Sequence, residues 1–484
     1  MPIVVAMASG KGGTGTSLLA GNMSLLLATL GKKVVAVDAS PGGAGLHGWL
    51  GIGEPRRALC DALAPGGPHL SELVMATAIP GLGLVPGETG DGWRGALDER
   101  GAATLAAQLR ELDAEVAVVD LPTGCSDFAV DLFMAADSGV LVMVPEPCSV
   151  ERGYRFLRAA FARRLRRAGR ADLLAGDGLP MPLDVFERAP EVLPEMTALR
   201  AAVVLNCVRS KSDTDLGRGI ATAGGRRLGL ALRYVGHVDY DDAVWVSLRR
   251  RRALLVEHPE SRASKCIEKV LRRVLQRDGE YAIGARAADP SRPESHYEIL
   301  EIEPTASDED IRRAHRRVRQ LYGRDSVAVS GLWSREALDA LQRRFDEAYA
   351  ILMDPARRKA YDQELFPEGV PMVRPPAARR RDTLAPPRRP PPALAPDVDL
   401  SGAIMKEVRE ALGIELREIS ERTKIGTTYL GAIEEEAFDR LPAPVYVRGF
   451  LVEYAKMLGL DVTRVLDTYY QRFLASRTRV EDQA

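Results

Sequence analysis

The sequence predicts an α/β domain with a mostly parallel sheet, followed by two small all-helical domains. Three observations support this prediction. Short apolar runs alternate with helix-like stretches over the first 283 residues, which is typical of parallel strands covered by helices on both faces. A glycine-rich segment, SGKGGTGTS, follows the first apolar run. A stretch rich in proline and arginine, residues 367–398, separates two later segments that look wholly helical and predicts an extended linker.

Length and composition limit the classes of protein to which this chain can belong. A chain of 484 residues is too long for one hydrophobic core, so several domains are expected. The formal net charge of −1 argues against a globally basic nucleic-acid-binding protein. The five cysteines show no paired short spacing, which predicts reduced thiols and not a zinc site or a disulfide framework. Without a signal peptide or a run of roughly 20 apolar residues, we expect a cytoplasmic protein.

The first domain is expected to span residues 1–283. Its predicted strands are the apolar runs Ile3–Met7, Val34–Val37, Val116–Val119, Val140–Val144 and Ala202–Leu205. The glycine-rich segment lies between the first strand and a helix expected over residues 17–30, where a phosphate-binding loop is normally found.

The glycine-rich segment has most features of a phosphate-binding loop. Glycines let backbone N–H groups point at a phosphate, and the segment supplies Gly10, Gly12, Gly13 and Gly15. Ser17 is placed to hold Mg²⁺ through its hydroxyl. Thr16, however, occupies the position where a lysine would reach the β- and γ-phosphates.

The segment 1–283 resembles the MinD/ParA family of deviant P-loop ATPases, and its MinD/FlhG-like branch in particular. The resemblance rests on SGKGGTGTS, VVAVDASPGGAGLHGWLG, VAVVDLPTGCSD and VVLNCVRS. It implies a P-loop NTPase-like fold with ATP and Mg²⁺ as ligands. Lys11 matches the signature lysine that reaches the partner's phosphates in an ATP-sandwiched homodimer, and Asn206 matches the residue that reads adenine. Asp120 matches the Walker B aspartate that assists Mg²⁺.

Two departures from the family concern hydrolysis. Thr16 replaces the loop lysine, and Ser40 replaces the switch aspartate that orients the attacking water, whereas Asp38 is retained. Losing one such electrostatic group commonly costs about 10²–10³ in rate. We therefore expect a pseudo-ATPase, with residual Mg·ATP binding left open. If the site is active, its catalytic residues are Lys11, Asp38 and Asp120.

Basic stretches in the first domain have two interpretations. Residues 151–170 and 249–252 are dense in arginine, and residues 261–277 form an amphipathic stretch. Solvated helix faces, with 261–277 packed as the last helix of the domain, are the favoured interpretation. Contact with an acidic partner, nucleic acid or a membrane surface is the alternative.

The second domain, residues 296–366, resembles the J domain of DnaJ-type co-chaperones. Ser307 is a predicted N-cap with Asp310 three residues on. A helical hairpin is expected from the apolar positions Ile311, Ala314, Val318, Leu321, Phe345, Ala348, Tyr349 and Leu352. The His-Pro-Asp turn of J domains reads Gly323-Arg324-Asp325 here, so we expect a protein-interaction module and no stimulation of a DnaK-type ATPase.

The third domain, residues 399–475, resembles the five-helix, repressor-like helix-turn-helix domain of RodZ-type cytoskeletal proteins. Its recognition helix, expected over residues 427–436, lacks Arg, Lys, Asn and Gln and ends in three glutamates, so DNA binding is not expected. The resemblance implies contact with the actin-like protein MreB through Tyr446, Phe450 and Tyr454, and the alternative is that these aromatics form the core. RodZ proteins continue into a transmembrane helix; this sequence does not, so a membrane-anchored role is not expected.

Together these features predict a bacterial cytoplasmic scaffold that organises cell polarity, the cytoskeleton or the motility apparatus through protein partners. This prediction rests on family analogy. The first alternative is an active, nucleotide-switched ATPase, and the second is a DNA-binding regulator.

Overall fold

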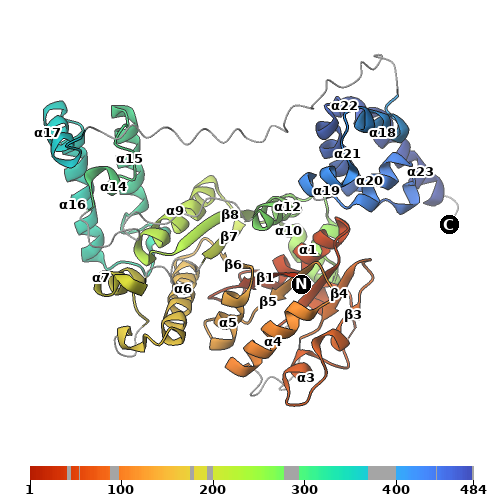
Figure 1. Cartoon of the computed structure of the whole chain (residues 1–484), viewed down its shortest axis with the longest axis horizontal. Helices are drawn as coiled ribbons and strands as arrows, with labels where there is room; N and C mark the ends of the chain where they lie inside the picture. The colour runs from red at the N-terminus through yellow and green to blue at the C-terminus, as the bar shows by residue number, and fades with distance from the viewer. Residues whose placement is uncertain are drawn as a thin grey trace. The chain divides into compact units, whose positions relative to one another are not determined.

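The computed structural model describes residues 1–40, 45–53, 55–87, 97–174, 179–192, 200–276, 294–368, 399–423, 425–442 and 444–481. Almost all of the predicted linker, 367–398, and the predicted end of the first domain at residue 283 lie outside these residues. The chain divides into two compact units (Figure 1). Most of the α/β domain and the helical region after it belong to the first unit, and the C-terminal helices belong to the second. No helix within the described ranges has the length and apolar character that a membrane crossing requires.

The α/β domain is built on a mostly parallel sheet. In the described residues its eight strands run in the order β3-β4-β2-β5-β1-β6-β7-β8, and only the β3–β4 pair is antiparallel. The strands are β1 (Ile3–Ala8), β2 (Val34–Asp38), β3 (Met75–Ala76), β4 (Leu82–Val85), β5 (Val116–Asp120), β6 (Ser138–Met143), β7 (Arg200–Val208) and β8 (Ala231–Asp239). The predicted fold class is confirmed, and β1, β2, β5, β6 and β7 are the five predicted strands.

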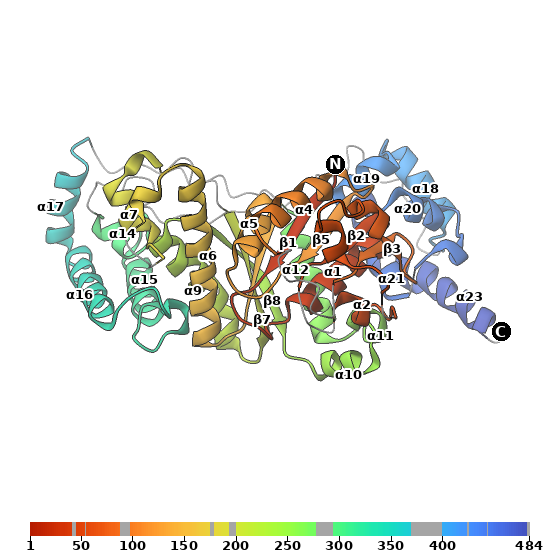
Figure 2. The same cartoon turned by 90° about the horizontal axis from the view of Figure 1, so that it is seen from below.

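Helices cover both faces of the sheet (Figure 2). One face carries α4 (Glu99–Glu111), α5 (Asp127–Ala135), α6 (Pro147–Arg167) and α9 (Lys211–Leu228). The other carries α1 (Thr16–Thr29), α11 (Leu254–Glu257) and α12 (Arg262–Leu275). The remaining helices are α2 (Leu46–Trp49), α3 (Leu59–Leu63), α7 (Pro182–Arg188) and α10 (Asp242–Arg250). The apolar stripe of α12 is buried, so the stretch 261–277 packs in the domain as expected.

The J-like region forms a helical hairpin. Its elements are α14 (His296–Ile299), α15 (Asp308–Leu321), the 3₁₀ turn η5 (Val327–Val329), α16 (Arg335–Leu352) and α17 (Pro355–Leu365). Ser307 caps α15 and Asp310 completes the capping box, as predicted. The apolar stripes of α15 and α16 face each other. Their buried side chains continue the core beneath α6 and α9 without a break.

The C-terminal unit is wholly helical in the described residues. It contains α18 (Gly402–Ala411), α19 (Leu416–Thr423), α20 (Thr427–Glu434), η6 (Phe438–Arg440), α21 (Pro444–Leu458), α22 (Val462–Val465), a π-helical turn η7 (Leu466–Tyr470) and α23 (Gln471–Glu481). The pair α19–α20 occupies the predicted helix-turn-helix positions. Its core draws on all the major helices, including Val408, Ile419, Leu430, Leu451 and Phe473.

Candidate nucleotide-binding site

The glycine-rich loop joins β1 to α1 at the carboxyl edge of the sheet, where ligands of α/β proteins usually bind. Gly13 and Gly15 have φ of +77° and +88°, in the region that favours glycine. Gly10 is required for a different reason. A Cβ at Gly10 would lie 2.2 Å from the carbonyl oxygen of Arg152 on α6, so the loop and α6 pack backbone against backbone.

Two further residues hold the loop in place. The Asn206 amide, at the end of β7, donates a hydrogen bond of 2.8 Å to the Thr14 carbonyl. Asn206 is 3% exposed, so its side chain supports the loop in addition to any contact with adenine that the family resemblance implies. The Thr16 and Thr14 hydroxyls lie 3.2 Å apart, and Thr16 is 9% exposed. Thr16 therefore completes a polar contact inside the loop and supplies no positive charge.

The signature lysine is engaged within its own chain. The Lys11 ammonium forms an ion pair with the Glu146 carboxylate, which lies just before α6. The hydrogen bond to Glu146 raises the pKa of Lys11. Sequence reasoning missed Glu146, because 135 residues separate the two partners. Both side chains remain partly exposed, at 33% and 55%, so the pair can open toward a ligand.

Two buried carboxylates lie at the ends of neighbouring strands. Asp38 of β2 and Asp120 of β5 are register partners and each is 1% exposed. Asp38 accepts hydrogen bonds from the backbone N–H groups of Leu46 (2.8 Å) and Ser40 (3.1 Å). Burial nevertheless raises the pKa of Asp38.

Asp120 is held differently. Burial, followed by the nearby Asp38 carboxylate, raises the pKa of Asp120 to about 8, against a smaller opposite effect of a hydrogen bond from the Ser17 hydroxyl. Its Oδ2 atom has no hydrogen-bond partner among the described residues. Such orphaned buried oxygens are rare and call for an explanation.

The environment of Asp120 fits a divalent cation. A carboxylate oxygen without a partner lies beside a serine hydroxyl, at the loop where the phosphates of a nucleotide would bind, and Mg²⁺ prefers such oxygen ligands. When bound, the ion would neutralise phosphate charge; Ser17 and Asp120 are the residues that would hold it. The structure thus brings Ser17, Asp38, Asp120 and the glycine loop together, with Lys11 at the rim.

A cavity of about 610 Å³ lies beside the loop. Gly10 and Gly124 line it, together with Arg152, Arg155 and Arg158 of α6. Arg158 donates to the Pro180 carbonyl at 3.1 Å, whereas Arg152 and Arg155 are exposed and make no ion pair within the described residues. Two of the arginines predicted to form a solvated face therefore border the candidate site.

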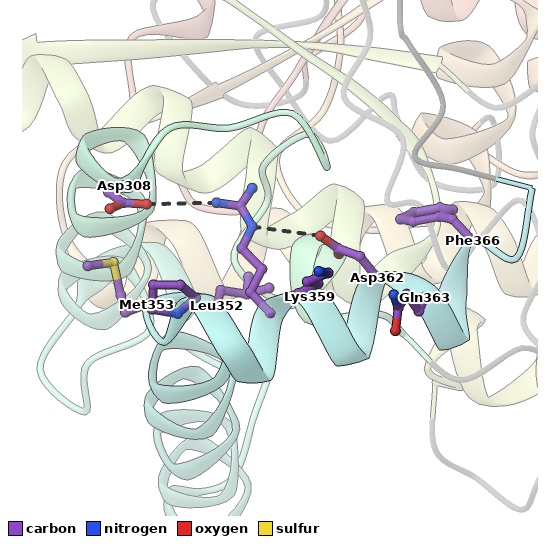
Figure 3. Close-up of a pocket in the computed structure, with 9 residues that line it drawn as sticks. Asp308, Leu352, Met353, Lys359, Asp362, Gln363 and Phe366 are labelled. Atoms are coloured by element: carbon purple, nitrogen blue, oxygen red, sulfur yellow. Dashed lines mark ion pairs between the residues drawn. The ribbon is translucent and has the colours of Figure 1, made fainter.

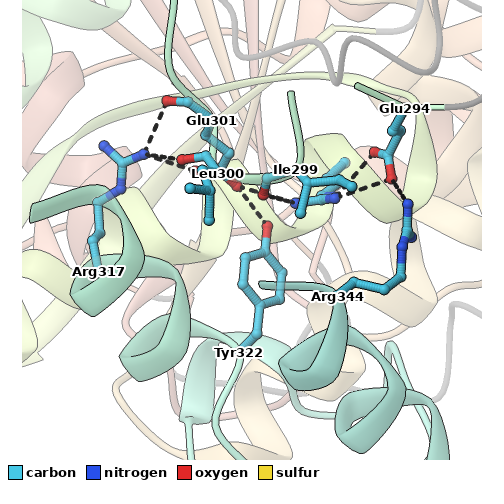
Figure 4. Close-up of polar contacts among 8 residues, drawn as sticks. Glu294, Ile299, Leu300, Glu301, Arg317, Tyr322 and Arg344 are labelled. Atoms are coloured by element: carbon cyan, nitrogen blue, oxygen red, sulfur yellow. Dashed lines mark hydrogen bonds and ion pairs between the residues drawn. The ribbon is translucent and has the colours of Figure 1, made fainter. Parts of the chain in front are cut away.

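A buried polar network joins the J-like helices to α9 (Figure 4). Arg226 of α9 donates to both carboxylate oxygens of Glu294, at 3.0 and 3.2 Å, and to the Ile299 carbonyl at 3.3 Å. Arg344 of α16 donates to the same carboxylate at 2.9 Å. The Tyr322 hydroxyl donates to Glu301 at 2.9 Å. Removing one partner of such a buried pair is strongly destabilising, because it leaves an uncompensated charge.

The turn of the J-like hairpin is also anchored. Arg324, in the Gly-Arg-Asp turn, pairs with Asp339 of α16. Tyr154 of α6 donates to the Ala328 carbonyl of η5 at 2.7 Å. A Cβ at Gly331 would lie 2.5 Å from Glu151. The segment after the turn therefore packs directly on α6, the helix that also contacts the glycine loop.

A second cavity, of about 470 Å³, lies along α17 (Figure 3). Arg358 is one of its lining residues, and its guanidinium lies 3.8 Å from the Asp308 carboxylate and 4.0 Å from the Asp362 carboxylate. The same guanidinium donates to the carbonyls of Pro304 and Ala306 at 3.1 and 2.9 Å. This arginine fixes the position of α17, and we assign the cavity a structural role.

The predicted partner-binding aromatics differ in exposure. Phe450 and Tyr454 are 3% and 0% exposed and belong to the core of the C-terminal domain, whereas Tyr446 is half-buried. The Tyr454 hydroxyl donates to Glu434. Phe450 and Tyr454 therefore have no surface to offer a partner in this conformation, because the helix turns them inward. Only Tyr446, of the three, keeps exposed area.

Two of the three glutamates that end the predicted recognition helix, Glu434 and Glu436, are structural. Both carboxylate oxygens of Glu434 accept hydrogen bonds from the Arg409 guanidinium, at 2.6 and 3.0 Å. Glu434 is 7% exposed. Glu436 accepts from the Gly402 N–H at 2.8 Å and from Arg472 at 2.9 Å. These contacts explain why acidic residues occur where a DNA-reading helix would carry basic or amide side chains.

Comparison with known proteins identifies three regions. The family profile described as NUBPL iron-transfer P-loop NTPase matches residues 2–162. A DnaJ domain profile matches residues 295–362, and a helix-turn-helix domain profile matches residues 404–465.

Individual relatives agree with this division. The antiactivator FleN of Pseudomonas aeruginosa is 28% identical over 274 residues, which cover 56% of this chain and 85% of FleN. The cytoskeleton protein RodZ of Streptococcus pneumoniae is 40% identical over 68 residues, 14% of this chain and a quarter (25%) of RodZ. The septum site-determining protein MinD complexed with Mg-ADP from Pyrococcus horikoshii is 20% identical with a TM-score of 0.42, over 57% of this chain and 97% of MinD. On the three profile matches and the FleN and RodZ relatives, the chain combines a MinD/ParA-like P-loop NTPase domain, a DnaJ domain and a C-terminal helix-turn-helix domain with homology to RodZ.

Proposed function

We propose that the protein is a cytoplasmic organiser of the ParA/FleN type, which binds Mg·ATP without appreciable turnover and uses the bound nucleotide to control protein partners. Cell polarity, the cytoskeleton and the motility apparatus are the expected settings. FleN is an antiactivator and RodZ a cytoskeleton protein, and both names describe regulation or organisation rather than metabolism.

One observation supports the proposed binding of Mg·ATP. Asp120 accepts a hydrogen bond from the Ser17 hydroxyl and leaves Oδ2 without a partner among the described residues, at a glycine loop whose positive φ angles are intact. Burial beside Asp38 makes the charged form of Asp120 costly unless a cation compensates it. A bound Mg²⁺ with its nucleotide would provide that compensation.

The loss of turnover follows from charge. Thr16 brings no cation to the β- and γ-phosphates, and Ser40 brings no carboxylate to orient water. Since phosphoryl transfer depends on positioning and charge stabilisation, two missing groups leave binding with little catalysis. An active ATPase is the competing outcome.

Helix α6 contacts both the glycine loop and the DnaJ domain. Its N-terminal end holds Glu146, the partner of Lys11, and Arg152, whose carbonyl contacts Gly10. Two residues further on, the Tyr154 hydroxyl donates to the Ala328 carbonyl of the DnaJ domain. A nucleotide that draws Lys11 from Glu146 would therefore act on the helix that supports η5. We propose that this segment reports nucleotide occupancy, in a monomer or in a homodimer.

Two measurements on the full-length chain test the proposal. Hydrogen exchange with and without Mg·ATP should show slower exchange in residues 9–17 and altered exchange in Val327–Val329. Phosphate release should stay at background. Release above background that Asp120→Asn abolishes would favour the active ATPase, and unchanged exchange in both segments would contradict nucleotide control.

Matched variants separate the two halves of the proposal. Thr16→Lys should tighten Mg·ATP binding by about tenfold, the value of one charge-assisted contact. Tyr154→Phe, which removes the hydrogen bond to the Ala328 carbonyl, should uncouple Val327–Val329 while leaving the response of residues 9–17. Tyr240→Phe is the control, because its hydroxyl bonds Asp242 and the residue is 43% exposed. Equal effects of both variants would argue against coupling through Tyr154.

A further inference from the structure

A cluster of three metal-ligating side chains lies at the edge of the sheet, away from the glycine loop. His237 and Asp239 come from β8, and Cys266 comes from α12, which packs against that strand. Their ligating atoms all lie within 4.8 Å of one another. No short cysteine spacing marks this cluster in the sequence, because the strand and the helix bring the groups together only in the fold.

The histidine is oriented for coordination. The Tyr234 hydroxyl lies 3.2 Å from Nδ1 of His237, and Nε2 lies 3.5 Å from the Asp239 carboxylate. Metal-binding histidines typically use one ring nitrogen for the ion and fix the other with a hydrogen bond. Here Nδ1 faces Tyr234, and Nε2 faces Asp239.

A bulge in β8 produces this orientation. The pairing of β8 with β7 shifts register between Tyr234 and Gly236. Residues three apart on a regular strand point to opposite faces, whereas the extra residue of the bulge brings Tyr234 and His237 to the same side. Bulges often re-aim side chains next to functional sites.

We propose that His237, Asp239 and Cys266 bind a zinc ion. Zn²⁺ accepts imidazole, carboxylate and thiolate together, and three protein ligands with water in the fourth position are a common arrangement. Mg²⁺ and Ca²⁺ prefer oxygen ligands only. Binding transfers the thiol proton to solvent, so that the Cys266 thiolate and the Asp239 carboxylate balance the 2+ charge.

The distances fit this ion with a small adjustment. Tetrahedral zinc with ligand bonds of 2.0–2.3 Å places its ligands about 3.3–3.8 Å apart, against an upper separation of 4.8 Å in the cluster. Cys266 is 9% exposed, so the site is shielded but close to the surface. Bound zinc would join α12 to the edge strand and stabilise this side of the domain.

Cobalt provides the direct test, because a thiolate bound to Co²⁺ gives a charge-transfer absorption band. The full-length chain, freed of metal with a chelator, is titrated with Co²⁺ and then with Zn²⁺. We expect a band that saturates at one equivalent and that Zn²⁺ displaces. Absence of the band, with cobalt still soluble and the protein folded, would overturn the proposal.

Variants assign the band to these residues. Cys266→Ser should abolish it, and His237→Ala should weaken cobalt binding strongly. Tyr234→Phe, which removes only the orienting hydroxyl, should weaken binding about 10–100-fold. Cys60→Ser, a distant cysteine on α3, should leave the titration unchanged. A band that survives Cys266→Ser or disappears in Cys60→Ser would contradict the assignment. No nucleotide is present, so the outcome is independent of the proposed function.

Discussion

Two buried carboxylates in different domains have opposite surroundings. Glu434 of the helix-turn-helix domain receives two hydrogen bonds from Arg409 and one from Tyr454. Asp120 of the P-loop domain is 1% exposed, lies near Asp38 and leaves Oδ2 without a partner in the described part of the chain. A satisfied buried charge serves the fold, whereas an unsatisfied one is costly and indicates a ligand.

The largest effect is expected where the satisfied pair is broken. Arg409→Met leaves Glu434 buried without its cation and should destabilise the C-terminal domain by about 3–5 kcal/mol. Hydrogen exchange of α20 and α21 in the full-length chain measures this loss locally. Arg440→Ala is the control, since Arg440 and its partner Glu435, 3.8 Å away, are both 67% exposed, and such pairs contribute about 0–1 kcal/mol. Equal losses in the two variants would contradict the structural role of Arg409.

A smaller effect is expected from the hydroxyl of Tyr454. Tyr454→Phe keeps the ring in the core and removes one hydrogen bond to a charged group, which costs about 1.5–3 kcal/mol. The same exchange measurement applies. A neutral result would mean that Arg409 alone satisfies Glu434, and a loss of partner binding without loss of stability would restore Tyr454 as an interaction residue.

The free energy of unfolding should depend on pH through the Asp120 carboxyl group. The pKa of Asp120 is about 8 in the folded protein and 3.8 ordinarily, so between these values the native state keeps a proton that the unfolded chain has released. Stability without Mg²⁺ should therefore fall as pH rises from 5 to 7, by about 1.4 kcal/mol per pH unit from this group. Asp120→Asn should remove that part of the slope. Thermal unfolding of both proteins in a chelator across this range would show it, and identical slopes would contradict a protonated Asp120.

The sequence was informative where local pattern decides structure. Short continuous apolar runs located β1, β2 and β5, and the Ser307 capping box located the start of α15. The glycine loop was placed correctly between β1 and α1, because its spacing is local.

Long-range partners were beyond sequence reasoning. Nothing in the spacing joins Lys11 to Glu146, Arg226 to Glu294, or Cys266 to His237, since the fold alone brings each pair together. The inward rotation of Phe450 and Tyr454 depends on how α21 packs, so a resemblance that marks them as a binding surface could not separate core from surface. An apolar stripe on a single helix likewise does not show whether its side chains face the core or a partner.

Calorimetric titration of Mg·ATP into the full-length chain, beside Asp120→Asn, tests the central claim most directly. We predict sub-millimolar, Mg²⁺-dependent binding by the natural protein and loss of the Mg²⁺ dependence in the variant, because Asp120 supplies the oxygen that the ion requires. No binding by the natural protein would mean that the loop only closes a turn of the fold. Equal binding by both proteins, with and without Mg²⁺, would mean that Asp120 is not poised for the ion.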